Sequence, residues 1–158
     1  FDAWKYKYGH DLSWRKKLTD LPVVETYENK QGQKVIMTHA GFTQFAEGTL
    51  PHPYELVWDR DHINDGWQMY ADKSVIIVHG HTPIPIIGEY LWTAPCEADI
   101  EPGVYWYCED EDGVSHKVDI DCGAFFTGHT TVLDLDTWEE YKFFAEDSYY
   151  KDPEKYAW

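Results

Sequence analysis

The chain has 158 residues, of which 43% are hydrophobic and 17% aromatic, and its formal net charge at pH 7 is −16. This length fits one domain, and this apolar content excludes a largely disordered chain. The sequence holds no apolar run of the roughly 18 residues that a membrane-spanning helix needs, and the acidic charge opposes binding to a nucleic-acid duplex.

The first part of the chain predicts a short helix and two strands. Asp11 to Asp20 begins with a capping aspartate and has apolar residues at helical spacing. Residues 23–27 and 34–38 then predict two strands, which are joined by a turn at Lys30 to Gln33. The second strand leads directly into His39-Ala40-Gly41.

The middle of the chain predicts a buried strand. Residues 65–72 are expected to be helical. Ser74 to Val78 then contains four consecutive β-branched apolar residues, which is typical of a strand buried on both faces. This strand leads into His79-Gly80-His81-Thr82-Pro83.

The last part predicts a hairpin-like insertion and three more strands. The insertion spans Gly88 to His116 and turns at Asp112-Gly113. Lys117 to Ile120 predicts a strand, and 130–135 and 140–144 predict two antiparallel strands.

Two histidines, His39 and His81, stand at the ends of predicted strands, and each has a glycine close by. In open α/β sheets, ligands bind beyond the carboxyl ends of the strands, and glycine lets the backbone approach a ligand closely. Neutral imidazole is a common ligand of divalent metals. The pair therefore indicates either a metal site or two structural histidines.

Several segments, in order along the chain, resemble motifs of the calcineurin-like metallophosphoesterases, in the branch of Ser/Thr protein phosphatases and bacterial diadenosine tetraphosphatases. Val35 to Gly41 resembles a strand followed by His-Ala-Gly, and Val75 to Pro83 resembles a strand followed by Gly-His-Thr-Pro. Leu56 to Arg60 is similar to Leu-Trp-x-Arg, and Val118 to Ala124 is similar to Asn-Ile-Asp-Thr-Gly-Ala. Thr131 to Thr137 resembles the closing strand.

The resemblance implies roles for three residues and assigns no catalytic residue. His39 and His81 would bind one metal ion of a dinuclear site. Arg60 would bind the substrate phosphate, because a guanidinium matches phosphate oxygens in a bidentate fork. The alternative for Arg60 is an ion pair with a neighbouring aspartate or with a helix end.

Other polar and aromatic residues have weaker assignments. His79 is interpreted as structural or as support for a metal ligand, and Asp121 as a packing or ligand-orienting carboxylate. The remaining histidines are expected at the surface: His10, His52, His62, His116 and His129. The aromatic residues of the insertion are interpreted as local core, with stacking on a nucleobase as the alternative. They are Tyr90, Trp92, Tyr105, Trp106 and Tyr107.

The motifs of the family's first half do not occur in this chain: Asp-x-His, Gly-Asp-x-x-Asp-Arg-Gly and Gly-Asn-His-Glu. We therefore expect residues 1–158 to form a single partial domain with an insertion at 88–116. Its fold class would be α/β (α+β): the C-terminal half of a metallophosphoesterase β-sandwich flanked by helices, with a mixed sheet and open strand edges. Two histidines leave a metal ion with too few ligands, so the chain alone is expected to be inactive.

For the intact enzyme, the resemblance implies a metal-dependent phosphoester hydrolase that binds two divalent metal ions. Manganese is the preferred expectation, with iron, zinc or nickel as alternatives. The expected substrate is a phosphoprotein, a dinucleoside polyphosphate or a small phosphomonoester, with neither a nucleic-acid duplex nor a membrane as partner. A homodimer of the fragment would cover the open strand edges. Three cysteines without regular spacing favour a cytoplasmic setting. The second hypothesis is a non-catalytic phosphoesterase-like binding module.

Overall fold

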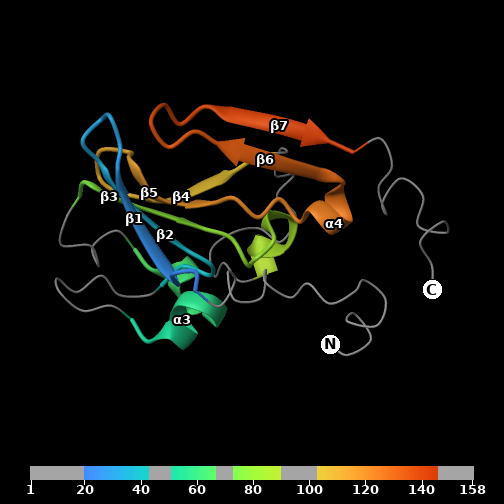
Figure 1. Ribbon diagram of the computed structural model, residues 1–158, viewed down its shortest axis with the longest axis horizontal. Helices are drawn as coiled ribbons and strands as arrows, with labels where there is room; N and C mark the ends of the chain where they lie inside the picture. Colours follow the sequence, from blue (N-terminus) through green and yellow to red (C-terminus); the bar gives the residue numbers. More distant parts are fainter. Residues whose placement is uncertain (1–19, 43–50, 67–72, 90–102, 146–158) are drawn as a thin grey trace.

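The computed structural model describes residues 20–42, 51–66, 73–89 and 103–145. They form a mixed α/β fold in which a two-stranded sheet lies on one side of a five-stranded sheet and the short helix α3 (Pro53–Trp58) lies on the other (Figure 1). This architecture confirms the expected class and the mixed sheet. Most of the helix expected at Asp11 to Asp20 falls outside the described residues.

The larger sheet has the strand order β1-β2-β3-β5-β4. Its strands are β1 (Val24–Glu28), β2 (Lys34–Thr38), β3 (Val75–His79), β4 (Tyr105–Glu109) and β5 (Ser115–Asp119). The three inner strands β2, β3 and β5 are parallel, and the outer strands β1 and β4 are antiparallel to their neighbours. The carboxyl ends of the inner strands therefore meet at one edge of the sheet.

The smaller sheet pairs β6 (His129–Leu133) with β7 (Glu140–Phe144) in antiparallel register. The helical segments are α3 (Pro53–Trp58), α4 (Ala124–Thr127) and the 3-10 helices η1 (Asp61–Asn64) and η3 (Ile84–Glu89). All the strands expected from the sequence are present, with shifts of one or two residues at their ends.

The core lies on both faces of the larger sheet, which explains why every residue of β3 is buried. On the face toward β6 and β7, Val35, Ile76, Val78 and Val118 pack against Leu133, Leu135 and Trp138. On the face toward α3, Ile36, Val75 and Ile77 pack against Phe42 and Leu56. Burial of such side chains contributes about 1.5–3 kcal/mol each.

The predicted insertion at residues 88–116 contributes a strand to the larger sheet in its second half. Strand β4 is an outer strand of the main sheet, and His116 lies within β5. The expected turn is present, because the Asp110 carboxylate accepts hydrogen bonds from the amides of Asp112 and Val114. The hairpin was recognisable from its turn, but its pairing with β3 depends on residues far away in the sequence.

The expected helix at 65–72 is not borne out where the structure describes it. Asp65 and Gly66 are not helical, and the 3-10 helix η1 comes just before them. Residues 67–72 lie outside the described part of the chain.

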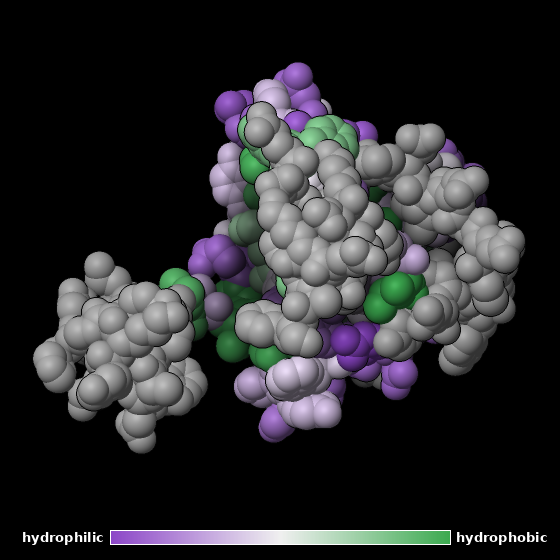
Figure 2. Space-filling view, turned by 90° about the vertical axis from the view of Figure 1, so that its right-hand side faces the viewer, coloured by the Kyte–Doolittle hydropathy of each residue, from purple (hydrophilic) through white to green (hydrophobic). Residues whose placement is uncertain are grey.

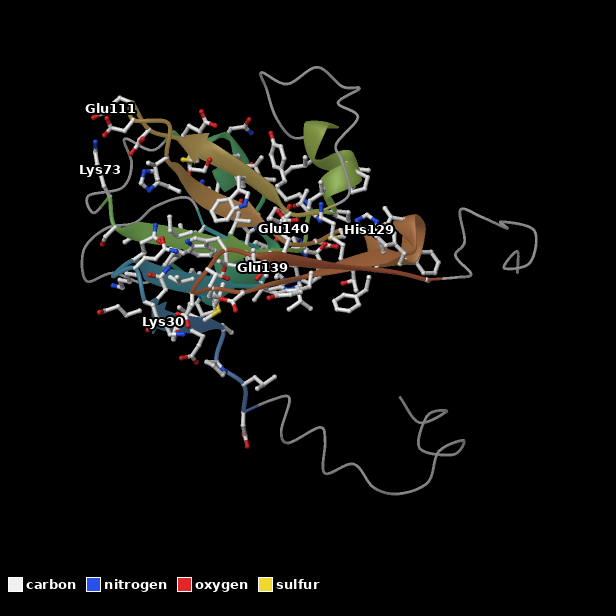
Figure 3. All side chains as sticks on the ribbon, turned by 90° about the horizontal axis from the view of Figure 1, so that it is seen from above. Lys30, Lys73, Glu111, His129, Glu139 and Glu140 are labelled. Carbon is white, nitrogen blue, oxygen red and sulfur yellow. The ribbon has the colours of Figure 1, made fainter. Side chains whose placement is uncertain are left out.

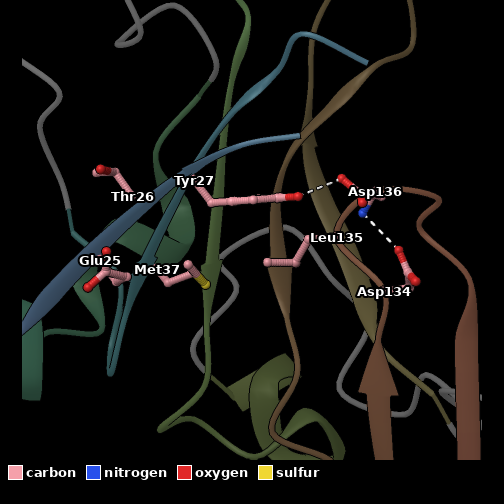
Figure 4. Close-up of a pocket in the computed structure, with 7 residues that line it drawn as sticks. All are labelled: Glu25, Thr26, Tyr27, Met37, Asp134, Leu135 and Asp136. Carbon is pink, nitrogen blue, oxygen red and sulfur yellow. Dashed lines mark hydrogen bonds between the residues drawn. The ribbon is translucent and has the colours of Figure 1, made fainter. Parts of the chain in front are cut away.

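Polar contacts join the two sheets, and one ion pair joins neighbouring segments of the larger sheet. Asn29, in the β1–β2 turn, donates to the Leu135 carbonyl at 3.0 Å. At the start of β3, Lys73 forms an exposed ion pair of 2.7 Å with Glu111 of the β4–β5 turn (Figure 3). The Tyr27 hydroxyl donates to Asp136 at 2.8 Å, beside a groove of about 410 Å³ (Figure 4).

That groove lies between β1 and the β6–β7 connection. It is lined by Glu25, Thr26, Tyr27, Met37, Asp134, Leu135 and Asp136. None of these residues was a candidate site residue in the sequence.

Surface polarity is mixed on the side of the molecule that carries α4 and the end of β7 (Figure 2). Phe125 and Phe144 are 70% and 64% exposed. Among the described residues, no helix is long and apolar enough to cross a membrane.

Candidate metal and phosphate site

The loop that carries His39 begins where β2 ends. The Thr38 hydroxyl accepts a hydrogen bond from the Gly41 amide at 2.8 Å, which turns the chain sharply. The Ala40 amide donates to the Leu56 carbonyl of α3 at 2.8 Å. These two bonds hold the exposed His39 side chain between the end of β2 and α3.

The loop that carries His81 begins at the end of β3 and is bound to its neighbours on both sides. The Gly80 amide donates to the His39 carbonyl at 2.9 Å, and the Ile84 amide donates to the Asp121 carbonyl at 2.8 Å. His81 itself has a φ of 70°, in the left-handed region. This conformation costs a non-glycine residue about 1–2 kcal/mol, and such strain is common at functional sites.

The two loops bring His39 and His81 together. Nε2 of His39 lies 3.1 Å from Nδ1 of His81, and the ring centroids are 4.9 Å apart. Two nitrogens bound to one metal ion at about 2.0–2.1 Å would lie roughly 2.9–3.4 Å apart, for angles between 90° and tetrahedral. The observed separation fits two ligands of one ion, and without an ion it fits a hydrogen bond between the rings.

The surroundings favour the neutral form of His81, which is the form that binds metals. Burial lowers its pKa below the usual value, and the positive charge of Arg60 lowers it further. The Asp121 carboxylate opposes this shift. The Nε2 atom of His81 is buried and makes no hydrogen bond of ordinary geometry.

The structure brings His39 and His81 together, and the charges of Arg60 and Asp121 act on the His81 ring. Arg60 follows α3 and is half-buried at the start of η1. Asp121 follows β5, and its carboxylate accepts the Gly123 amide at 2.9 Å. It therefore shapes the turn after β5.

A buried polar cluster lies beneath this site, and it includes a histidine expected at the surface. His62 is fully buried, with its ring edge-on to His79 at a centroid distance of 4.8 Å. His79 is also buried, and its Nε2 lies 2.5 Å from the Tyr107 hydroxyl. The Lys117 ammonium donates to the His62 carbonyl. The surface prediction for His62 is wrong because the ring fills the space beside Gly41.

His116 is likewise buried, which corrects the second of these surface predictions. Its Nε2 lies 3.1 Å from the Asp110 carboxylate, and its Nδ1 lies 3.2 Å from the Val75 carbonyl. These two contacts replace the hydrogen bonds that the buried imidazole would otherwise make to water. His52 is exposed, as expected, and His129 is half-buried. His10 lies outside the described residues.

Burial changes the pKa values in this cluster strongly. It lowers the pKa of His62 to about 2 and that of Lys117 to about 8. The carboxyl of Asp119 is fully buried near the end of β5, and burial raises its pKa to about 8. Its Oδ1 accepts the Asp121 amide at 2.9 Å, while Oδ2 has no partner.

Trp58 is the residue at this site that the sequence interpretation overlooked. It ends α3, is 57% exposed and meets the His81 ring edge-on at a centroid distance of 5.4 Å. The aromatic residues 105–107 instead lie in or against the core, as the local-core interpretation predicted. Tyr90 and Trp92 lie outside the described residues.

The described ranges contain no group of three or more His, Cys, Asp or Glu side chains placed to hold a metal ion. Within the described ranges, the pair His39 and His81 offers two imidazole nitrogens to one ion, fewer than the four ligands of a tetrahedral site. No family model matches the chain, and no curated protein matches it either.

Proposed function

We propose that this chain is the C-terminal part of a metal-dependent phosphoester hydrolase of the Ser/Thr protein phosphatase type. In this proposal His39 and His81 hold one divalent metal ion, and Arg60 binds the substrate phosphate. The observation that carries it is the 3.1 Å separation of two imidazole nitrogens at the carboxyl ends of parallel strands.

The chain's own residues have distinct tasks in this proposal. His81 stays neutral because burial and Arg60 lower its pKa, so its ring nitrogen is available to a metal. Arg60 places a permanent positive charge beside the imidazole pair, where a phosphate would be bound. A bound divalent ion would supply Lewis-acid polarisation of a phosphoryl oxygen. The metallophosphoesterase sandwich, with its second half supplied from outside these 158 residues, is part of the same proposal.

The proposal predicts a weak but specific metal site in the chain as it stands. We expect Mn²⁺ or Ni²⁺ to broaden the ring resonances of His39 and His81 selectively in NMR titrations. His39→Ala and His81→Ala should each weaken metal binding about tenfold or more, because each variant leaves the ion with one imidazole ligand in place of two. His52→Asn is the matched control: it removes an exposed imidazole and keeps a residue that can cap α3.

Metal binding that is equal in the wild type, His39→Ala and His81→Ala would remove these residues from any metal site. The non-catalytic binding module would then be the better description. With Mn²⁺ present, the chain alone should hydrolyse an aryl phosphate no faster than buffer does. Turnover well above buffer would contradict the view that the catalytic site is incomplete.

A further inference from the structure

Trp58 is placed at the rim of the site by the geometry of α3. Leu56, two residues earlier, is buried against the main sheet and fixes the rotation of the helix. Trp58 therefore points away from the core, with 57% of its surface exposed and its ring edge-on to His81.

The exposure of this indole contrasts with the other tryptophans in the described residues. Trp106 and Trp138 meet edge-on at 5.1 Å and pack between the two sheets. Trp58 belongs to none of the hydrophobic clusters. An indole left in water beside an imidazole pair and an arginine offers a large apolar surface to a ligand.

An arginine and a tryptophan, which recognise different parts of a ligand, are therefore neighbours in the chain. Arg60 follows Trp58 by two residues, at the start of η1, and the Trp58 ring lies against His81. A guanidinium suits phosphate oxygens, while an indole suits a flat aromatic ring. We propose that Trp58 selects the organic part of the substrate, and that the preferred substrates are phosphate esters with a planar aromatic group close to the phosphate.

This inference rests on the proposed phosphate role of Arg60 and adds the class of substrate. An aromatic group of this kind is either a phenol ring joined to phosphorus through one oxygen or a nucleobase further away. Stacking of a base on an aromatic side chain changes affinity by roughly 5- to 150-fold. A phosphate ester whose organic part is aliphatic has no ring to stack on Trp58 and gains no such affinity.

The test compares binding of phenyl phosphate, AMP and glycerol 2-phosphate to the full chain by NMR titration. We expect the wild type to bind at least one aromatic ester about fivefold or more tightly than glycerol 2-phosphate. Trp58→Ala should abolish this preference, and Trp58→Phe should keep part of it. Tyr54→Ala is the matched control, because Tyr54 is a 65% exposed aromatic residue one turn earlier on α3.

The outcomes separate this inference from the proposed function. Arg60→Gln should weaken binding of all three esters alike; if it changes nothing, the phosphate site is wrong. If Arg60→Gln weakens binding but the aromatic preference is absent in the wild type or persists in Trp58→Ala, the role of Trp58 is wrong. Absence of binding by every ester also overturns the inference. If only phenyl phosphate binds more tightly than glycerol 2-phosphate, the aromatic group of the substrate is a phenol ring. If only AMP does, it is a nucleobase.

Discussion

Gly41, at the end of the His39 loop, shows how one residue without a side chain can shape the site. Its φ is +87°, and a Cβ atom there would lie 2.6 Å from Nε2 of His62. The ring of His62 and the backbone of the His39 loop thus share one space. The loop can take this course only with glycine at position 41.

We expect Gly41→Ala to destabilise the protein by about 2–5 kcal/mol, through left-handed strain plus overpacking against His62. Gly32→Ala is the matched control: its φ is +78°, but a Cβ there would meet nothing within 4 Å. It should cost only about 1–2 kcal/mol. Urea denaturation measures both, and equal losses would show that the His62 ring does not restrict Gly41.

At the scale of elements, the contact between the β1–β2 turn and the β6–β7 connection holds the two layers together at one end. Asn29 is buried there, and its side chain accepts hydrogen bonds from the amides of Gln31 and Gln33. The same side chain donates to the Leu135 carbonyl and to the Gln33 side chain. One residue therefore shapes the turn and joins the sheets.

Asn29→Ala should lower the free energy of unfolding by about 2–4 kcal/mol, because buried partners lose their hydrogen bonds. Gln31→Ala removes an exposed hydrogen bond to the Asp136 carbonyl across the same contact and should cost below about 1 kcal/mol. Thermal and urea unfolding distinguish the two variants. A loss after Gln31→Ala as large as that after Asn29→Ala would contradict the importance of burial.

The sequence predicted those elements whose signals are local. Four β-branched residues in a row identified β3, and the turn residues around Asp112 identified the β4–β5 hairpin. It failed where distant segments decide the outcome. His62 and His116 were expected at the surface because their burial depends on a turn and a strand that are distant in the sequence. Trp58 was read as part of an apolar run because its exposure depends on the rotation of α3, which the buried Leu56 determines. The pairing of His39 with His81 was predictable because both stand at the ends of strands, but their 3.1 Å separation was not.

For the whole molecule, buried ionisable groups make stability depend on pH in a protein of net charge −16. Asp119 has a folded-state pKa of about 8, against about 3.9 in an unfolded chain. Between about pH 4 and pH 8, the folded protein keeps a proton that the unfolded chain has lost. This residue therefore lowers stability progressively as pH rises through that window.

We predict that Asp119→Asn is more stable than the wild type near pH 8, by a few kcal/mol as an order of magnitude, and that the gain vanishes toward pH 4. The asparagine oxygen can still accept the Asp121 amide. Urea unfolding at several pH values measures the difference. Asp112→Asn, in the exposed β4–β5 turn, is the control and should give no such trend. A gain that is the same at pH 4 and pH 8 would contradict the burial of a protonated carboxyl.

Lys117 acts in the opposite sense over a separate pH range. Its folded-state pKa is about 8, against about 10.4 when unfolded, so the unfolded chain binds the extra proton between these values. Stability therefore rises with pH above about 8. Measurements on Asp119→Asn are best made at pH 8 and below, where the contribution of Lys117 does not vary with pH.

The parallel pairing of β2 with β3 has a consequence for how this chain can vary. Parallel neighbours cannot be joined by a tight turn, so the polypeptide must travel back along the sheet before β3 can begin. That return path runs through α3 and η1, and it is also where Trp58 and Arg60 are attached. A deletion that removed α3 and η1 would therefore take away the indole and the guanidinium together with part of the path that lets β2 and β3 pair in parallel.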